Sequence, residues 1–137
     1  MYSRNKEMKT LIDKKGNRYL WKKGDIHTQY GVIKEQDIKK NKTGTIHSHT
    51  GKEFIIFTAS FQDKLSKSKR GAATTHAKDI GQIIATTGIN NKSKIVDAGS
   101  GSGMLAAHLA NISSHVTTYE KNKEFYTIAK KNLERLG

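Results

Sequence analysis

Three alternating glycines, Gly99, Gly101 and Gly103, follow Asp97 and precede an apolar segment with helical spacing. Glycine has no side chain, so the backbone of such a turn can approach a ligand closely. A helix that begins directly after the turn also points free backbone N–H groups at an anion. The spacing therefore predicts a ligand-binding turn. The alternative is a connecting turn whose glycines only permit close packing.

A carboxylate follows these glycines at a distance typical of ribose recognition. The run from His115 to Tyr119 predicts a strand, and Glu120 comes directly after it. An acidic residue at the tip of a strand, about 20 residues past the glycines, can accept hydrogen bonds from both ribose hydroxyls. The glycines and Glu120 together favour a nucleoside-like cofactor.

The glycine spacing narrows the choice of cofactor. The hydride-carrier fingerprint is G-x-G-x-x-G, but the third glycine comes one position early, and Met104 stands where that pattern has glycine. The chain has no G-x-x-x-x-G-K-[ST] loop, which argues against a nucleoside triphosphate. An acidic residue two positions before G-x-G-x-G is similar to motif I of S-adenosylmethionine-dependent methyltransferases. In that motif Asp97 could reach the cofactor ammonium through water, or simply brace the glycine turn.

The elements around the turn predict an α/β fold with parallel strands. Ile95 to Ala98 is a short apolar run that predicts a buried strand, and apolar residues at helical spacing follow the glycines. Residues 77–87 predict a helix before that strand, and a last helix begins near Asn122. Helix, strand, helix, strand, helix is the first half of a Rossmann-like methyltransferase domain, with two parallel strands.

The N-terminal half predicts a small antiparallel β domain. Residues 6–22 and 43–58 have the pattern of two hairpins, because apolar runs flank turn residues. Residues 34–40 predict a helical turn, with Ile33 and Ile38 facing inward. We expect three segments: an N-terminal β domain over residues 1–62, a basic linker over 63–76, and a partial cofactor-binding domain over 77–137.

The charge of the chain favours a polyanionic partner. There are 25 Lys and Arg against 12 Asp and Glu, a net charge of +13, and residues 1–71 hold 17 basic and 7 acidic residues, or +10. Nucleic acid and an anionic membrane surface are the partners that such charge favours. Four cations of the predicted linker could contact phosphates or belong to a solvated connector: Lys64, Lys67, Lys69 and Arg70.

Several classes of site are excluded. The chain has no cysteine, so it has no disulfide, thiolate metal site or cysteine nucleophile. His47 and His49 are two residues apart, but no third ligand stands near them in sequence, and we expect no metal. No apolar run approaches the roughly 20 residues of a membrane span, and no signal-peptide core follows the N-terminus, so we expect a cytoplasmic protein without a membrane partner.

Taken together, these stretches resemble the archaeal branch of the tRNA (adenine-N1)-methyltransferases that act at positions 57/58 of the T-loop. The resemblance covers essentially the whole chain, and the order and spacing of its pieces agree with the family. The pieces are Gly16-Asn17-Arg18-Tyr19-Leu20, Asp25-Ile26-His27-Thr28 with Gly31, Ser48 to Phe54, Lys69 to Asp79, the glycine motif and Thr118-Tyr119-Glu120.

The resemblance implies an N-terminal β domain followed by a Rossmann-like catalytic domain, usually assembled as a tetramer, that methylates tRNA with S-adenosylmethionine. Glu120 would hold the ribose of that cofactor, and Thr74 to Asp79 would lie near its methionine end. The residues implied to contact the cofactor are Asp97, Gly99, Ser100, Gly101, Ser102, Gly103 and Glu120.

One departure from the family pattern is large. The catalytic aspartate of the family lies on a D-x-P-x-P-type motif after the fourth strand, and this sequence has no counterpart of it. We therefore expect a partial enzyme that is inactive alone. Two alternatives stay open: a non-catalytic RNA-binding module, and a protein-repair (isoaspartyl) methyltransferase, against which the N-terminal β half and the basic charge argue.

Overall fold

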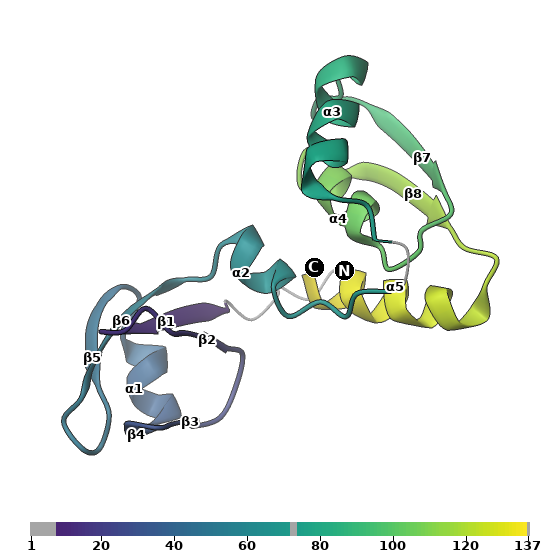
Figure 1. Ribbon diagram of the computed structural model, residues 1–137. Coiled ribbons are helices and arrows are strands. Elements are labelled where there is room, and N and C mark those ends of the chain that lie inside the picture. Colours follow the sequence, from purple (N-terminus) through teal and green to yellow (C-terminus); the bar gives the residue numbers. More distant parts are fainter. Residues whose placement is uncertain (1–7, 72–73, 137) are drawn as a thin grey trace. The chain divides into compact units, whose positions relative to one another are not determined.

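The computed structural model describes residues 8–71 and 74–136. Residues 1–7 of the predicted β domain, residues 72–73 of the predicted linker and Gly137 lie outside the described residues. The chain forms two compact units, Met1–Ser66 and Lys67–Gly137, which run from purple to teal and from teal to yellow in Figure 1. Each unit is described by itself below.

The first unit is built on a four-stranded antiparallel sheet. Leu11 pairs with Tyr19 on one side and with Ile56 on the other, so the two predicted hairpins lie next to each other. The strand order is β2-β1-β6-β5, with β1 at Lys9–Asp13, β2 at Arg18–Trp21, β5 at Gly44–His47 and β6 at Glu53–Thr58.

A small hairpin and a short helix complete the core of this unit. The hairpin consists of β3 (Ile26–Thr28) and β4 (Gly31–Ile33), and helix α1 (Glu35–Lys40) follows it. Ile33 and Ile38 are fully buried, which confirms the prediction that they face inward. The buried apolar cluster comprises Leu11, Trp21, Ile33, Ile38, Ile46, Phe54 and Ile56.

Lys9 ties the sheet to the end of helix α1. Its side chain is buried, and its Nζ donates hydrogen bonds to the carbonyl oxygens of Ile38 (2.7 Å) and Asn41 (2.8 Å). The last carbonyls of a helix have no partner within the helix and carry the negative end of its dipole. The buried ammonium of Lys9 therefore satisfies these carbonyls and is itself stabilised by them.

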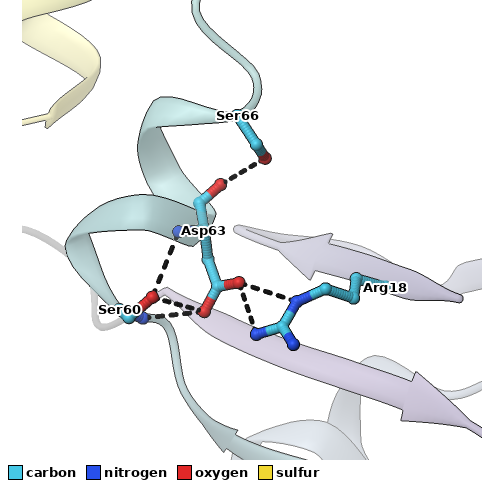
Figure 2. A network of polar contacts seen from close by, with 4 residues as sticks. All are labelled: Arg18, Ser60, Asp63 and Ser66. Atoms are coloured by element: carbon cyan, nitrogen blue, oxygen red, sulfur yellow. Dashed lines mark hydrogen bonds and ion pairs between the residues drawn. The ribbon is translucent and has the colours of Figure 1, made fainter. Parts of the chain in front are cut away.

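Helix α2 (Phe61–Leu65) lies where the sequence predicted the start of the linker, and this prediction missed it. Ser60 and Asp63 form a capping box, in which each side chain accepts a hydrogen bond from the backbone N–H of the other residue. The second oxygen of Asp63 accepts from Arg18 Nε (2.9 Å) and Nη2 (2.6 Å) (Figure 2). This network fastens α2 to strand β2.

The second unit contains two parallel strands joined through a helix. Strand β7 (Lys94–Ala98) pairs with β8 (His115–Tyr119), and α4 (Met104–Ala110) connects them. Helices α3 (Ala77–Thr87) and α5 (Lys123–Leu136) pack against α4. The predicted order of an antiparallel sheet followed by parallel strands with helices is thus confirmed.

One face of the β7–β8 pair is open to solvent. Val96 is 73% exposed and Tyr119 62% exposed, whereas the alternate residues Ile95 and Val116 are half-buried. Parallel strands are usually covered on both faces. None of the helices formed by residues 8–71 and 74–136 is both long and apolar enough to cross a membrane.

Candidate cofactor-binding site

The pairing of β7 with β8 places the glycine turn beside the end of β8. Ala98 is paired with Tyr119 at the last position of the register. The backbone N–H groups of Gly99 and Ser100 both donate to the carbonyl of Tyr119, over 2.8 and 2.9 Å. The turn is therefore held on the strand whose next residue is Glu120.

Glu120 contacts the glycine turn directly. Its Oε2 accepts a hydrogen bond from the backbone N–H of Gly101, and its Oε1 accepts one from the backbone N–H of Asn122, each over 2.8 Å. These hydrogen bonds, that from Asn122 first, hold the pKa of Glu120 below its ordinary value. The side chain is therefore an ionised acceptor at neutral pH, next to the turn.

The turn is not the cradle of free amides that the sequence predicted. The N–H groups of Gly99 and Ser100 bind Tyr119, that of Gly101 binds Glu120, and that of Gly103 donates to the carbonyl of Ser100 over 2.7 Å. These four donors are used within the chain, because the turn folds back onto β8. These four N–H groups are therefore not free donors for the anion that the pattern indicated.

Two of the glycines are needed for different reasons. Gly99 has a φ of +99°, and a Cβ built on it would meet no atom within 4 Å. Gly103 has a φ of +81°, but its Cβ would lie 3.3 Å from the Leu133 side chain and 3.4 Å from Ala129. The backbone at Gly99 is thus open to an approaching ligand, whereas Gly103 permits close packing of α4 on α5.

Asp97 braces the glycine turn through two hydroxyl groups. Thr118 Oγ1 donates to Asp97 Oδ2 over 2.7 Å and lies 2.5 Å from Ser100 Oγ. Because the proton of Thr118 is directed at the carboxylate, Ser100 is the donor to Thr118. The sequence left two roles open for Asp97, contact with the cofactor ammonium through water and bracing of the glycine turn. The hydrogen bonds of the structure show the bracing role.

The two serines of the turn face the protein. Ser100 and Ser102 are both buried, and Ser102 Oγ lies 3.4 Å from Thr74 Oγ1. Their side chains are therefore engaged by Thr118 and Thr74, and a ligand at the turn would meet their backbone. The contact with Thr74 brings the segment before α3 to the turn.

Asn132 is a residue of the site that the sequence analysis missed. Its buried amide donates to the carbonyls of Lys69 and Ser102, each over 2.8 Å, and accepts from the backbone N–H of Lys69 over 2.9 Å. The sequence feature that could have indicated this residue is an asparagine among the apolar residues of the last helix, three residues after Ala129 and directly before Leu133. The backbone of Lys69 and the carbonyl of Ser102, which meet at this point, explain why an amide is buried there.

The four cations predicted to contact RNA lie in two different units. Lys64 is half-buried on α2 in the first unit. Lys67, Lys69 and Arg70 are exposed and belong to the second unit. The described part of the predicted basic linker is therefore divided between the two units.

No group of three His, Asp or Glu side chains within residues 8–71 and 74–136 could hold a metal ion. His49, one of the two neighbouring histidines, accepts a hydrogen bond at Nδ1 from the backbone N–H of Val32 over 2.8 Å. A Cβ on Gly31 would lie only 2.8 Å from the His49 ring. This histidine therefore packs the loop after β5 against the β3–β4 hairpin.

Comparison with known proteins identifies relatives of this chain. A family model described as ribosomal RNA adenine dimethylase matches residues 74–137. A tRNA (adenine(57)-N(1)/adenine(58)-N(1))-methyltransferase, TrmI, of Methanocaldococcus jannaschii is 38% identical over 134 residues, 94% of this chain and 47% of that protein. The tRNA (adenine(58)-N(1))-methyltransferase TrmI of Thermus thermophilus is 27% identical over 130 residues, 90% of this chain and 51% of that protein.

Two solved structures have the same fold. The crystal structure of an S-adenosylmethionine-dependent O-methyltransferase from Thermotoga maritima gives a TM-score of 0.80 at 26% identity, over 97% of this chain and 52% of that one. The crystal structure of the tRNA (m1A58) methyltransferase TrmI from Aquifex aeolicus gives a TM-score of 0.72 at 23% identity, over 97% of this chain and 53% of that one. At this identity the similarity supports the fold alone. The chain spans about half the length of the relatives that it matches.

The class to which these comparisons point is that of the S-adenosylmethionine-dependent methyltransferases. Within that class, the chain is a homologue of the TrmI tRNA (adenine-N1)-methyltransferases and matches their N-terminal half. The family recognised from the sequence motifs is therefore confirmed.

Proposed function

We propose that this chain is the cofactor-binding part of a tRNA adenine-N1-methyltransferase that acts at T-loop position 57 or 58 and uses S-adenosylmethionine. The observation that carries the proposal is the 2.8 Å contact between Glu120 and Gly101, next to the open backbone of Gly99. It joins a ribose acceptor to a turn that a nucleoside can approach. The similarity to TrmI enzymes supports the choice of adenine in tRNA.

The charge of the turn favours a cation over a phosphate. Asp97 and Glu120 bring two carboxylates to its two sides, while the four amides named above are used within the chain. S-adenosylmethionine carries a sulfonium and an ammonium, and when bound it supplies an electrophilic methyl group. We assign Glu120 to the ribose, and we assign Asp97, in addition to its bracing of the turn through Thr118, to the ammonium side through water.

Glu120 has the capacity for this role. A carboxylate offers about four lone-pair sites, and the backbone N–H groups of Gly101 and Asn122 occupy two of them. Glu120 therefore keeps acceptor capacity for the two ribose hydroxyls while the same hydrogen bonds fix its orientation. Transfer of the methyl group to an adenine nitrogen needs little acid–base help, so positioning supplies most of the rate.

Isothermal titration of the chain with S-adenosylhomocysteine tests the proposal. We expect saturable binding with one ligand per chain, and no binding of NAD or ATP under the same conditions. Binding of NAD with equal affinity, or no heat with S-adenosylhomocysteine, would contradict the proposal.

Three finer statements remain predictions: that the 137-residue chain is inactive alone, that it assembles as a tetramer and that it is cytoplasmic. Transfer of tritium from labelled S-adenosylmethionine to unmodified tRNA tests the first, and turnover by the chain would contradict it. The target base would have to leave its stack before reaction. Sedimentation equilibrium tests the assembly.

A second candidate function is favoured by one comparison. The Thermotoga maritima structure is described as an O-methyltransferase, and a protein-repair methyltransferase transfers its methyl group to a carboxyl oxygen. Methyl transfer to an isoaspartyl peptide, without transfer to tRNA, would favour this alternative. RNA binding without affinity for S-adenosylhomocysteine would instead favour a non-catalytic RNA-binding module.

A further inference from the structure

We propose that residues 67–70 form a fixed basic strip that binds RNA phosphates beside the glycine turn, and that Asn132 is its positioning residue. The proposal rests on the proposed function, because it names the partner surface next to the proposed cofactor site. It differs from the sequence expectation in two respects. Lys64 is not part of the strip, and the strip is held in place by the last helix.

The Asn132 amide holds the backbone at the centre of the strip. Its Oδ1 accepts from Lys69 N–H (2.9 Å) and its Nδ2 donates to Lys69 C=O (2.8 Å), as a neighbouring β-strand would do. The same Nδ2 donates to the carbonyl of Ser102 over 2.8 Å. Burying an amide is costly unless it is hydrogen-bonded. Here both Nδ2 donors and the Oδ1 acceptor are used to join the strip, helix α5 and the glycine turn.

Further contacts hold both ends of the strip. Arg135 Nη2 donates to Ser68 Oγ over 2.8 Å, which attaches the first half of the strip to helix α5. On the other side, Thr74 Oγ1 donates to the carbonyl of Gly71 over 3.0 Å. A Cβ on Gly71 would lie 3.7 Å from the Cβ of Ser102. Gly71, which follows the strip, therefore lies next to Ser102 of the turn, with room for no more than a small side chain between them.

The side chains of the strip are available to a polyanion. Lys67, Lys69 and Arg70 are exposed, and the ion pairs found among the described residues involve other cations. The sequence contains no acidic residue between Asp63 and Asp79. Because the backbone is already fixed, ordering these three cations on phosphates costs less entropy than it would in a free linker.

RNA is the polyanion that this position favours over an anionic lipid surface. A substrate whose base is to be methylated must bring its backbone close to the turn, and the strip ends there. Flexible cations on a free linker would bind a membrane equally well. A strip fixed against the proposed cofactor site is useful for a nucleic acid whose base must be positioned.

Fluorescence anisotropy with unmodified tRNA between 50 and 200 mM salt tests the charges of the strip. The test variant is Lys67→Gln, Lys69→Gln, Arg70→Gln. The matched control removes three exposed lysines of the first unit, Lys22→Gln, Lys23→Gln, Lys52→Gln, with the same change in charge. We expect the test variant to lose at least about tenfold in affinity and its salt slope to fall by roughly 0.7 to 0.9 per lost phosphate contact. Equal losses in the two variants would overturn the proposal.

Variants that keep all three cations test the positioning role. Asn132→Ala should weaken tRNA binding severalfold without any change in charge. Because this variant removes a buried amide and could unfold the second unit, Ser68→Ala, which deletes only the Arg135 anchor, provides a milder one. Melting temperature reports on folding in both. Unchanged affinity in a folded Asn132→Ala protein would show that the strip needs no fixed backbone.

Two further measurements separate this proposal from its alternatives. Stronger strip-dependent binding to phosphatidylserine vesicles than to tRNA would overturn the choice of RNA. Titration of the unaltered chain with S-adenosylhomocysteine reports on the proposed function alone. If tRNA binding depends on the strip but the chain does not bind S-adenosylhomocysteine, the proposed function is contradicted and the proposal for the strip stands. If the chain binds S-adenosylhomocysteine but tRNA binding does not depend on the strip, only the proposal for the strip is contradicted.

Discussion

At the scale of single residues, two glycines with similar backbone angles differ in their surroundings. Gly99 and Gly103 both have positive φ, but a Cβ would meet open space at Gly99 and crowd Leu133 and Ala129 at Gly103. We expect Gly99→Ala to lower the free energy of unfolding by about 1–2 kcal/mol from backbone strain alone. Gly103→Ala should cost about 1–3 kcal/mol more because it adds overpacking.

Urea denaturation of the two glycine variants measures this difference. Cofactor affinity should instead fall more in Gly99→Ala than in Gly103→Ala, because the backbone at Gly99 is the part that a ligand would approach. Equal losses of stability in the two variants would contradict the packing role of Gly103.

Glu120 is the residue on which the proposed ligand depends most. We expect Glu120→Gln to weaken S-adenosylhomocysteine binding by about tenfold, because a charged acceptor is replaced by a neutral amide. Glu124→Gln, at an exposed position on the first turn of α5, is the matched control. Isothermal titration compares the two variants, and an equal effect would show that only net charge matters.

The pKa of Glu120 makes a related prediction about pH. Hydrogen bonds from the backbone N–H groups of Asn122 and Gly101 hold this pKa below its ordinary value, so the carboxylate is ionised at neutral and mildly acidic pH. Affinity for S-adenosylhomocysteine should therefore be flat between pH 7 and about pH 5 as far as Glu120 is concerned. Titrations at three pH values in this window check it, and a steep loss near pH 6 would point to another group.

Sequence reasoning at this scale was limited to residues whose partners are near in the chain. The proximity of Glu120 to the glycines follows from strand–turn–helix–strand order and was predicted. The Thr118 brace of Asp97 and the Asn132 amide depend on contacts over 21 and 63 residues. Their partners are set by sheet register and helix packing, which local spacing does not encode.

At the scale of elements, helix α2 depends on one carboxylate. Burial alone would raise the pKa of Asp63, but hydrogen bonds from Ser60 and Arg18 outweigh it and hold that pKa below its ordinary value. A carboxylate with a depressed pKa stabilises the fold above its unfolded-state value, and this contribution is lost as the pH falls through the folded value. We expect the first unit to lose stability below about pH 4 for this reason.

The variant Asp63→Asn tests this origin of acid sensitivity. It should be less stable than the unaltered chain at pH 7, and the difference should shrink towards pH 3. Thermal unfolding followed by the fluorescence of Trp21, which is buried in the first unit, measures it. A difference that stays constant from pH 7 to pH 3 would contradict the role of the ionised carboxylate.

Most elements could be predicted because their apolar periodicity is local. Helix α3 and strand β8 have the predicted bounds, and strands β2 and β6 lie within the two predicted hairpins. Helix α2 was missed because Phe61 and Leu65 are its apolar residues and the rest of the segment is polar. Its stability comes from the capping box and from Arg18, which is 45 residues away from Asp63.

At the scale of the whole molecule, the sheet of β7 and β8 has one face that is open to solvent. Val96 is 73% exposed although it lies in a parallel pair of strands. If this face is also open in solution, Val96→Thr should change the free energy of unfolding by less than about 0.5 kcal/mol. It should also lower the binding of a hydrophobic dye.

Denaturation and sedimentation of the Val96→Thr protein, with Ile95→Thr as a half-buried control, check this prediction. Ile95→Thr should be clearly destabilising because its side chain faces the helices. A large loss of stability in Val96→Thr, together with a change in sedimentation, would mean that copies of the chain cover this face.

The burial of Lys9 has a practical consequence for measuring the protein. An amine can be acylated only when it loses its proton and meets the reagent, and this one is enclosed by the carbonyl oxygens of Ile38 and Asn41. Its labelling with acetic anhydride should therefore lag far behind that of the solvent-facing lysines. The rate at which Lys9 is acetylated, measured by mass spectrometry of the peptide that contains it, would then report how often the first unit opens.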